Sequence, residues 1–150
     1  MPTKPLTAVL KVIGLAASLE QRFNPALGSI FGLSTRDYLF LLYLANAPKN
    51  RLRRVDLAAM LSIAQSSISH MGDPLEKRGL VTREADTHDA RVSYAVLSKE
   101  GKKIVDEASA VMNDIAVSLF DERWSAKDLE QFAQRLTQLT FGSPSHLAVG

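Results

Sequence analysis

Residues 55–80 read VDLAAMLSIAQSSISHMGDPLEKRGL, and they predict two short helices joined by a tight turn. Apolar residues at helical spacing place the first helix at 55–61, and the Ser-rich segment 65–71 begins the second. Gly79 is expected to end the second helix, because glycine readily adopts the left-handed conformation that follows a helix C-terminus. Two short helices separated by about three residues are typical of a helix-turn-helix.

The sequence after Gly79 changes to the periodicity of β-strands. Residues 80–85 and 92–97 are short β-prone runs, and the segment 86–90 between them is polar. The two runs therefore predict a β-hairpin. Because a helix-turn-helix followed by a hairpin is a winged helix, we expect a mainly α-helical fold with a small β-hairpin wing.

The segments before this unit are predicted to be helical. Apolar residues recur at steps of three and four over 6–31, and Asn24-Pro25 should kink or interrupt that helix because proline has no backbone N–H. Gly32 is expected to end it. Ser34-Thr35-Arg36-Asp37 has the pattern of a capping box, which opens a strongly apolar helix over 38–45.

Two further helices are predicted after the hairpin. Ser98 is expected to cap a long helix over 99–120, and Ser125-Ala126-Lys127-Asp128 is a second capping box that opens a last helix. The helices at the two ends of the chain are too long and too apolar for a small winged core to cover. We therefore expect them to pack against a second copy in a two-fold dimer.

The length of 150 residues predicts one domain, 1–150. Within it, residues 33–100 form the winged helix-turn-helix lobe, and residues 1–32 and 101–141 form the dimerisation helices. The segment 142–150 contains Ser, Pro and Gly and is expected to be a frayed tail.

The middle of the chain is more basic than its ends. Residues 47–103 hold eleven Lys or Arg and seven Asp or Glu, although the whole chain has a net charge of only +2. This distribution favours a local surface that faces a polyanion. An ordinary solvated face explains the charge alone at least as well.

Composition excludes several other classes of protein. The chain has no cysteine, so thiolate catalysis and Cys-based zinc sites are excluded. No apolar run reaches the roughly 18 residues that span a bilayer. The first dozen or so residues resemble a signal peptide, but Glu20, Gln21 and Arg22 follow without a turn-forming cleavage segment. We therefore expect a cytoplasmic protein.

The sequence shows no arrangement typical of an enzyme or of a cofactor site. It has no nucleophile with a base, no phosphate-binding glycine loop and no paired carboxylates, so we expect no enzymatic activity and no cofactor. Asp86-x-His88-Asp89 could supply metal ligands, but no other chelating residue is nearby in the sequence. We interpret it as the polar tip of the hairpin and expect no metal.

The motif Asp89-x-Arg91-x5-Leu97-Ser98-x2-Gly101 resembles the wing signature of the MarR family of bacterial transcriptional regulators. Upstream, Leu33-Ser34 with Tyr38 and Leu41 is similar to the start of that family's second helix. The stretch from Asp56 to Ser69 resembles its helix-turn-helix. The resemblance runs in order from Leu33 to Gly101.

This resemblance implies a homodimer that binds double-stranded DNA, with recognition helices in successive major grooves and wings in the adjacent minor grooves. The residues expected to meet base edges share short hydrogen-bonding side chains at the start of the second helix: Gln65, Ser66, Ser67, Ser69 and His70. Some of these serines could instead only satisfy the helix N-terminus.

The basic residues around the predicted helices have implied roles as well. Arg91 corresponds to the wing-tip arginine of the family, and Asp89 can hold its guanidinium in place. A purely structural ion pair between these two residues is the alternative. The expected phosphate partners are further cations of the lobe: Arg53, Arg54, Lys77 and Arg83.

The sequence departs from the family pattern at three places. Pro74 stands where the family usually has a basic residue, and it removes a hydrogen bond to the His70 carbonyl, so we predict a kink or break near Met71. His70 stands where arginine is common. Arg53 and Ala64 occupy positions where Ser or Thr would normally cap a helix.

The resulting hypothesis is a repressor that a small aromatic or lipophilic anion releases from DNA. The ligand would bind between the dimerisation helices and the lobe and shift the recognition helices away from a spacing of about 34 Å, one turn of DNA. Tyr38, Phe23, Phe31 and Met112 could line that cleft, although apolar residues at helical spacing often belong to the core.

Two alternatives remain open for the function. One is a winged-helix dimer with degenerate DNA reading that acts through protein partners, for which Pro74, His70 and the modest net charge are the motivation. The other is a metal-responsive regulator. The missing cysteines exclude regulators of this family that sense peroxides through a thiol.

Overall fold

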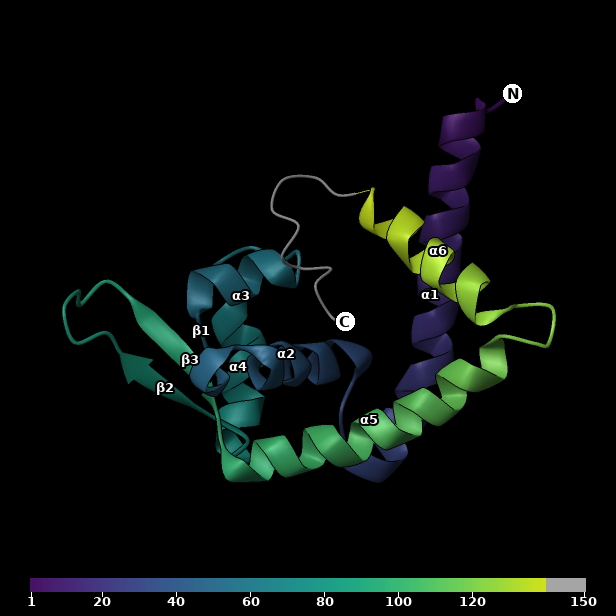
Figure 1. Ribbon diagram of the computed structural model, residues 1–150. Helices are drawn as coiled ribbons and strands as arrows, with labels where there is room; N and C mark the ends of the chain where they lie inside the picture. The colour runs from purple at the N-terminus through teal and green to yellow at the C-terminus, as the bar shows by residue number, and fades with distance from the viewer. Residues whose placement is uncertain (140–150) are drawn as a thin grey trace.

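The computed structural model describes residues 1–139, which form a mainly helical chain with one small sheet (Figure 1). The helices are α1 (Lys4–Phe31), α2 (Thr35–Asn46), the 3-10 helix η1 (Pro48–Asn50), α3 (Arg54–Met60), α4 (Ser67–Lys77), α5 (Lys99–Leu119) and α6 (Ala126–Thr137). The strands are β1 (Arg51–Arg53), β2 (Val81–Ala85) and β3 (Ser93–Leu97). The predicted fold class is confirmed. The expected frayed tail, 142–150, lies outside the described residues.

The sheet has three antiparallel strands in the order β1-β3-β2. The hairpin of β2 and β3 was predicted, and its tip extends away from the helices (Figure 1). The sequence did not predict β1, because three residues with two arginines show no apolar alternation. Its pairing with β3, in which Arg53 lies opposite Tyr94, covers an edge that would otherwise be unpaired.

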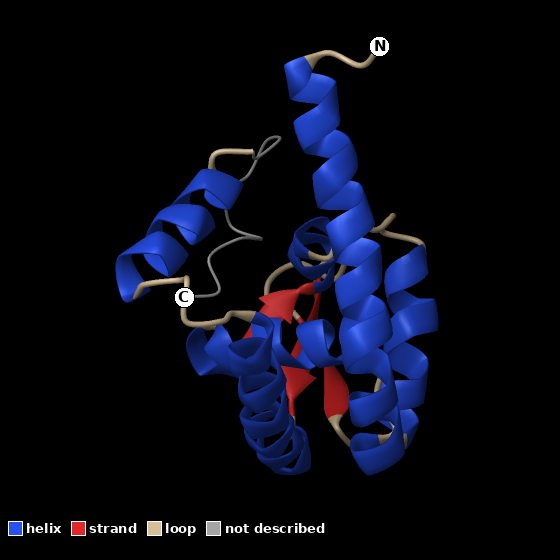
Figure 2. Cartoon of the chain, turned by 90° about the vertical axis from the view of Figure 1, so that its right-hand side faces the viewer, coloured by secondary structure: helices blue, strands red, loops and turns tan. Residues whose placement is uncertain are grey.

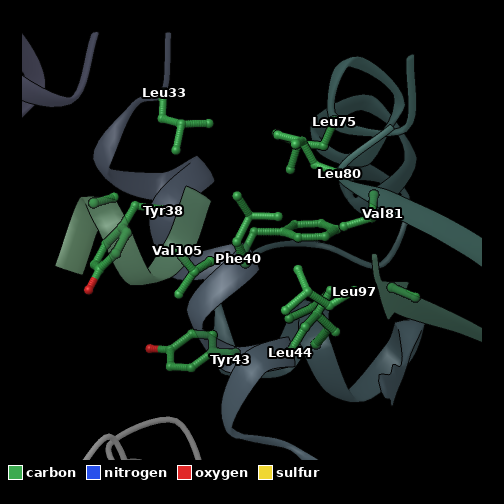
Figure 3. Packing of buried hydrophobic residues seen from close by; sticks show 14 of the residues in the cluster. Leu33, Tyr38, Phe40, Tyr43, Leu44, Leu75, Leu80, Val81, Leu97 and Val105 are labelled. Atoms are coloured by element: carbon green, nitrogen blue, oxygen red, sulfur yellow. The ribbon is translucent and has the colours of Figure 1, made fainter. Parts of the chain in front are cut away.

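The core of the winged lobe is built around α2. Phe40, Leu41 and Leu44 have no exposed surface, and Figure 3 shows Phe40 extending toward Val81 of β2. The predicted capping box positions this helix, since Ser34 Oγ accepts from the Asp37 N–H and the Asp37 carboxylate accepts from the Ser34 N–H. The apolar sequence of α2 is therefore explained by burial on several sides.

The first helix continues through Pro25, so the predicted interruption at Asn24-Pro25 is wrong. Pro25 and Gln21, whose carbonyl loses its partner, are both exposed, and water can hydrate that carbonyl. Asn24 also ties this part of α1 to the start of α2: its Oδ1 accepts from the Thr35 N–H at 2.8 Å and from the Thr35 hydroxyl at 2.6 Å. Gly32 ends the helix in the left-handed conformation, as predicted.

The helix α4 also runs without a break, and the predicted break near Met71 is wrong. Pro74 lies on the exposed side, and so does His70, whose carbonyl lacks its usual donor. On the inner side Ile68 and Leu75 are buried and hold both halves of the helix against the lobe. The residue that caps α4 is Ser66 rather than Ala64, although the Ser66 side chain forms no capping hydrogen bond.

The N-terminal half of α1 stands clear of the lobe (Figure 2). Its large apolar side chains are exposed, among them Leu10 at 52% and Ile13 at 61%. Within residues 1–139, no helix combines the length and the apolar character needed to cross a bilayer. The exposed apolar side chains of α1 are therefore not part of a membrane-spanning helix.

Candidate nucleic-acid interface

The start of α4 presents small polar side chains to the solvent. Gln65, Ser66, Ser67 and His70 are exposed, and within residues 1–139 their side chains make no hydrogen bonds. Gln65, Ser66 and Ser67 stand at the N-terminus of α4, where the backbone N–H groups and the helix dipole favour anions. These four residues are therefore placed as the sequence predicted and are available to a partner.

Arg54 and Ser69 are placed differently from the expectation. Arg54 begins α3 and is only 7% exposed; its Nη2 donates to Ser69 Oγ at 2.7 Å, and its Nη1 lies 3.6 Å from Glu76 Oε1. Burial lowers the pKa of Arg54, and the nearby positive charge of Arg83 lowers it further. The negative charges of Glu76 and Asp73 raise it. A guanidinium remains charged in proteins. Arg54 thus packs against α4, and its guanidinium is engaged by side chains of that helix.

Arg83 of β2 is engaged with two carboxylates of α4. Its Nε donates to Glu76 Oε1 at 2.9 Å and its Nη2 to Asp73 Oδ1 at 3.0 Å. The hydrogen bond to Glu76 is the main cause that raises the pKa of Arg83. Lys77, in contrast, is exposed at the end of α4 and within residues 1–139 has no ion-pair partner.

Arg91 lies near the wing tip with 91% of its side chain exposed. Its Nε and Nη2 donate to the two carboxylate oxygens of Asp89 at 3.2 and 3.3 Å, as predicted for the support of this arginine. The side-chain hydrogen bond from Arg91, followed by its backbone N–H, lowers the pKa of Asp89. The guanidinium is oriented by Asp89 and still faces the solvent.

The fold brings Arg53 close to Arg91 at the wing. Arg53 and Arg54 at the junction of β1 and α3 line a hollow of 70 Å³ together with Arg91 and its neighbours Val92 and Ser93. Arg53 also contributes to the lowered pKa of Asp89, which places its charge near the wing. Two cationic segments that are almost forty residues apart in the sequence therefore share one surface.

A further polar cluster at the base of the wing was not predicted. The Arg51 guanidinium lies 4.3 Å from the centre of the Tyr94 ring, and its Nη1 donates to Glu84 Oε1 at 3.1 Å. The Tyr94 hydroxyl donates to Asp86 Oδ2 at 3.0 Å. Arg51 lies in the strand that the sequence did not reveal, so only the pairing of β1 with β3 brings these residues together.

Asp86 has a structural role at the hairpin tip. Its Oδ1 accepts from the backbone N–H groups of His88 at 2.7 Å and Asp89 at 3.0 Å. These two bonds, then the hydrogen bond from Tyr94, lower the pKa of Asp86. In the described part of the chain, no three His, Asp or Glu residues form a group that could hold a metal ion.

The four residues predicted for a ligand cleft do not all line one cavity. Tyr38 is 7% exposed, and its hydroxyl lies 2.9 Å from Ser109 Oγ, which joins α2 to α5. Phe31 and Met112 are half-buried against the core. Phe23 alone among the four lines a cavity of 440 Å³ between α1, α5 and α6, whose other lining residues are Leu15, Leu19, Ala116, Leu119, Phe120, Trp124 and Phe132.

Comparison with known proteins places this geometry in a family. Residues 33–93, which span the lobe from before α2 to the start of β3, match the model of the MarR family. The chain is also similar to Sco3205, a MarR family transcriptional regulator from Streptomyces coelicolor solved in complex with DNA; the two are 26% identical, with a TM-score of 0.79 over 93% of this chain and 88% of that one. The winged lobe of this chain thus matches the MarR family model, and the chain as a whole is similar to a solved MarR-family regulator.

Other MarR-family structures share the fold at lower identity. A regulator from Rhodococcus sp. RHA1 is 22% identical, with a TM-score of 0.83 over 95% of this chain and 99% of that one. S. aureus MepR, in its complex with DNA, is 22% identical with a TM-score of 0.74 over 93% of this chain and 97% of that one. The predicted resemblance to the MarR family is confirmed by the match of residues 33–93 and by these solved structures, which share the winged-helix fold. These MarR-family proteins are regulators of transcription, not enzymes.

Proposed function

We propose that this MarR-family protein binds DNA as a dimer, with α4 in the major groove and the wing in the adjacent minor groove. The observation that carries the proposal is the pair of exposed surfaces: the polar start of α4, and the arginines 53 and 91 that share one hollow. A wing-tip arginine suits a narrow minor groove, because the negative potential there is strong. Sco3205 and MepR, which share the fold, were both solved with DNA.

The structure divides the predicted DNA-binding residues into two proposed groups. Residues with exposed side chains contact DNA directly: Gln65, Ser66, Ser67 and His70 at base edges, and Arg53, Lys77 and Arg91 at the backbone or minor groove. The other side chains already have partners within the lobe. Arg54 donates to Ser69, and Arg83 donates to Glu76 and Asp73. We assign Arg54, Ser69 and Arg83 to the support of α4.

The dimer is proposed from the distribution of exposed apolar side chains. Most of them lie on α1, at the end of α5 and in the loop that follows α5: Leu6, Val9, Leu10, Val12, Ile13, Leu15, Val117, Leu119 and Trp124. The apolar cavity of 440 Å³ between α1, α5 and α6 adjoins them. A second copy is the occupant we propose, because burial of this surface is worth about 25 cal/mol per Å².

The regulatory part of the proposal is that an aromatic or lipophilic anion relieves repression. Tyr38 joins the lobe to α5 through Ser109, and Phe23, Phe31 and Met112 come from the flanking helices α1 and α5. A ligand that takes over the Tyr38 hydroxyl would release α2 from α5. The lobes of the dimer could then move, and the spacing of the two α4 helices would shift away from one turn of DNA.

The alternative of a protein-binding dimer with degenerate DNA reading loses one of its motivations. A break near Pro74 was one of them, and α4 is continuous there. His70 in place of a common arginine still favours weaker contact with phosphate or guanine. We therefore keep DNA binding as the proposed function.

The experiment is fluorescence anisotropy of the purified protein with DNA from upstream of its own gene, at two salt concentrations and beside a scrambled duplex. Arg91→Ala should weaken binding, since it removes a minor-groove contact. Arg123→Ala is the matched control, because Arg123 is 84% exposed and pairs with Asp121 two residues earlier, as Arg91 pairs with Asp89. It should leave binding unchanged.

Binding that prefers the native duplex, weakens steeply with salt and falls only with Arg91→Ala supports the proposal. Equal weak binding to both duplexes shows that the upstream DNA is not a preferred site. Selection from random-sequence DNA then decides, and failure to enrich any sequence overturns the proposal.

A further inference from the structure

Arg54 is the one buried charged residue in the part of the chain that the structure describes, with 7% of its surface exposed. Burial of an unpaired charge is strongly unfavourable, so a buried arginine is expected to be fully engaged. The Arg54 guanidinium meets two side chains of α4, the Ser69 hydroxyl at 2.7 Å and the Glu76 carboxylate at 3.6 Å. Arg54 itself begins α3, so it links the two helices of the helix-turn-helix.

The positions of these two partners are informative. Ser69 and Glu76 are seven residues apart, which puts them two turns apart on the same face of α4. Between them lies Pro74, which cannot donate to the His70 carbonyl. The Arg54 guanidinium therefore bridges the interval of the helix in which one backbone hydrogen bond is missing.

The bridge continues into the wing. Glu76 also accepts from Arg83 of β2 at 2.9 Å, and Arg83 donates to Asp73 at 3.0 Å. One polar network thus connects the start of α3, both halves of α4 and the first strand of the hairpin. A network of this kind restricts how far α4 can rotate or bend relative to the wing.

We propose that Arg54 is a positioning residue that splints the recognition helix α4 across Pro74 and sets the orientation in which α4 meets DNA. The inference rests on the proposed DNA binding but assigns Arg54 a different role from a phosphate contact. Its side chain is 9% exposed and donates to Ser69, whereas the side chain of Arg91 is 91% exposed at the wing. Ser69, as a partner of Arg54, belongs to the splint and not to the base-reading surface.

The salt dependence of DNA binding separates the two roles of an arginine. Loss of a phosphate contact lowers the slope of log affinity against log salt by about 0.9. Loss of a positioning residue leaves that slope unchanged and lowers the preference for the selected site over a scrambled duplex. Arg53 is the matched control, since it is the adjacent arginine and is exposed.

The test compares the full-length wild type with Arg54→Met, Pro74→Ala and the double variant, and with Arg53→Met. Arg54→Met should lower the preference for the selected site by about tenfold, as for one charge-assisted hydrogen bond, with an unchanged salt slope. Pro74→Ala restores the backbone donor and should rescue most of that loss in the double variant. Arg53→Met should reduce the salt slope by about one.

Amide hydrogen exchange of the free protein is a second measurement that does not depend on DNA. Arg54→Met should reduce protection in α4 on both sides of Pro74, and Pro74→Ala should restore it. Ser69→Ala, which keeps the buried charge and removes one partner, should act in the same direction more weakly and serves if Arg54→Met does not fold. If no DNA sequence is selected by the wild type, the proposed function fails while this exchange measurement still tests the splint.

A salt slope that falls by about one in Arg54→Met overturns the inference, because Arg54 would then contact phosphate. Unchanged amide protection of α4 in Arg54→Met overturns the inference too, and so does the absence of rescue by Pro74→Ala. In either case the contacts of Arg54 across Pro74 would contribute nothing to the stability of α4.

Discussion

Large apolar side chains are mostly buried in the winged lobe, but many are exposed on the helices that flank it. In the lobe, Phe40 and Leu44 have no exposed surface, whereas Leu10 and Ile13 of α1 are 52% and 61% exposed. The core of α2, α3, α4 and the sheet is completed by Leu27 of α1 and by Val105 and Ala108 of α5, while the upper part of α1 and α6 lie apart from that core (Figure 2). The difference supports the proposal that the parts of the flanking helices outside this core pack against a second copy.

The two glycines at 101 and 14 give the largest expected effect. A Cβ at Gly101 would overlap the Leu80 carbonyl oxygen, but a Cβ at Gly14 would meet nothing within 4 Å. Gly101→Ala should therefore lower the free energy of unfolding by about 3 kcal/mol. Gly14→Ala should raise it slightly, by up to about 1 kcal/mol, because alanine favours the helix. Urea unfolding measures both, and equal effects at the two positions would contradict the comparison.

Charges on α1 test whether its apolar surface is an interface. The double variant Leu10→Asp/Ile13→Asp should weaken dimerisation by about hundredfold or more, since each side chain is worth about 1.5 kcal/mol or more when buried. Val55→Asp is the control, because Val55 is an apolar residue of the lobe that is 38% exposed. Sedimentation equilibrium reports the association constant. A dimer that survives the double variant would place the interface elsewhere.

Arg78 is the contact that joins the lobe to the end of α1. Its Nη2 donates to the Phe31 carbonyl at 2.7 Å and its Nη1 to the Gly32 carbonyl at 3.0 Å, where a cation also suits the helix dipole. Arg78→Ala should lower the free energy of unfolding by about 1 kcal/mol. Lys77→Ala, at the adjacent exposed cation, should change it by less than about 0.5 kcal/mol. Thermal unfolding distinguishes them, and equal effects would mean that the carbonyl contacts add nothing.

The smallest effect is expected at the wing tip, where the turn depends on the charge of Asp86. The backbone N–H groups of His88 and Asp89 and the Tyr94 hydroxyl lower the pKa of this carboxyl. A lowered folded-state pKa means that the turn is stabilised above the ordinary carboxyl pKa of about 3.9 and loses that stabilisation as the pH falls through the folded value. Protection of the His88 and Asp89 amides should therefore decrease as the pH falls below about 3.9, the ordinary carboxyl pKa.

Asp86→Asn should remove this pH dependence, because the amide keeps an acceptor oxygen and does not titrate in this range. Protection factors measured by NMR at pH 6 and pH 3 make the comparison. Protection that is the same at both pH values in the wild type would show that the ionised form has no special role.

The parts of the fold that the sequence predicted depend on interactions between near neighbours. The capping boxes at Ser34 and Ser125 and the cap at Ser98 each join residues three positions apart, and Gly32 ends α1 by its own backbone preference. The hairpin likewise pairs adjacent runs. These features are visible in the sequence because the partners of a cap lie within one helical turn and the two strands of the hairpin are joined by one short loop.

The candidate site was only partly predictable. Exposure of Gln65, Ser66, Ser67 and Arg91 agrees with the roles that the family resemblance implied, and their contact with DNA stays a prediction. The fate of Arg54 could not be predicted, since Arg53 and Arg54 are adjacent and chemically identical in the sequence. Only the packing of α3 against α4 buries one and exposes the other.

The sequence by itself therefore determined where the helices begin, where the hairpin turns and which family the lobe resembles. The tertiary structure decided the rest: that β1 forms, that α1 and α4 continue through their prolines, and that Arg54 is buried between two helices. The physical reason is the distance along the sequence between the groups that interact. Caps and turns are satisfied by neighbours in the chain, but the continuity of a helix through a proline and the burial of a charge depend on partners that only the folded chain brings together.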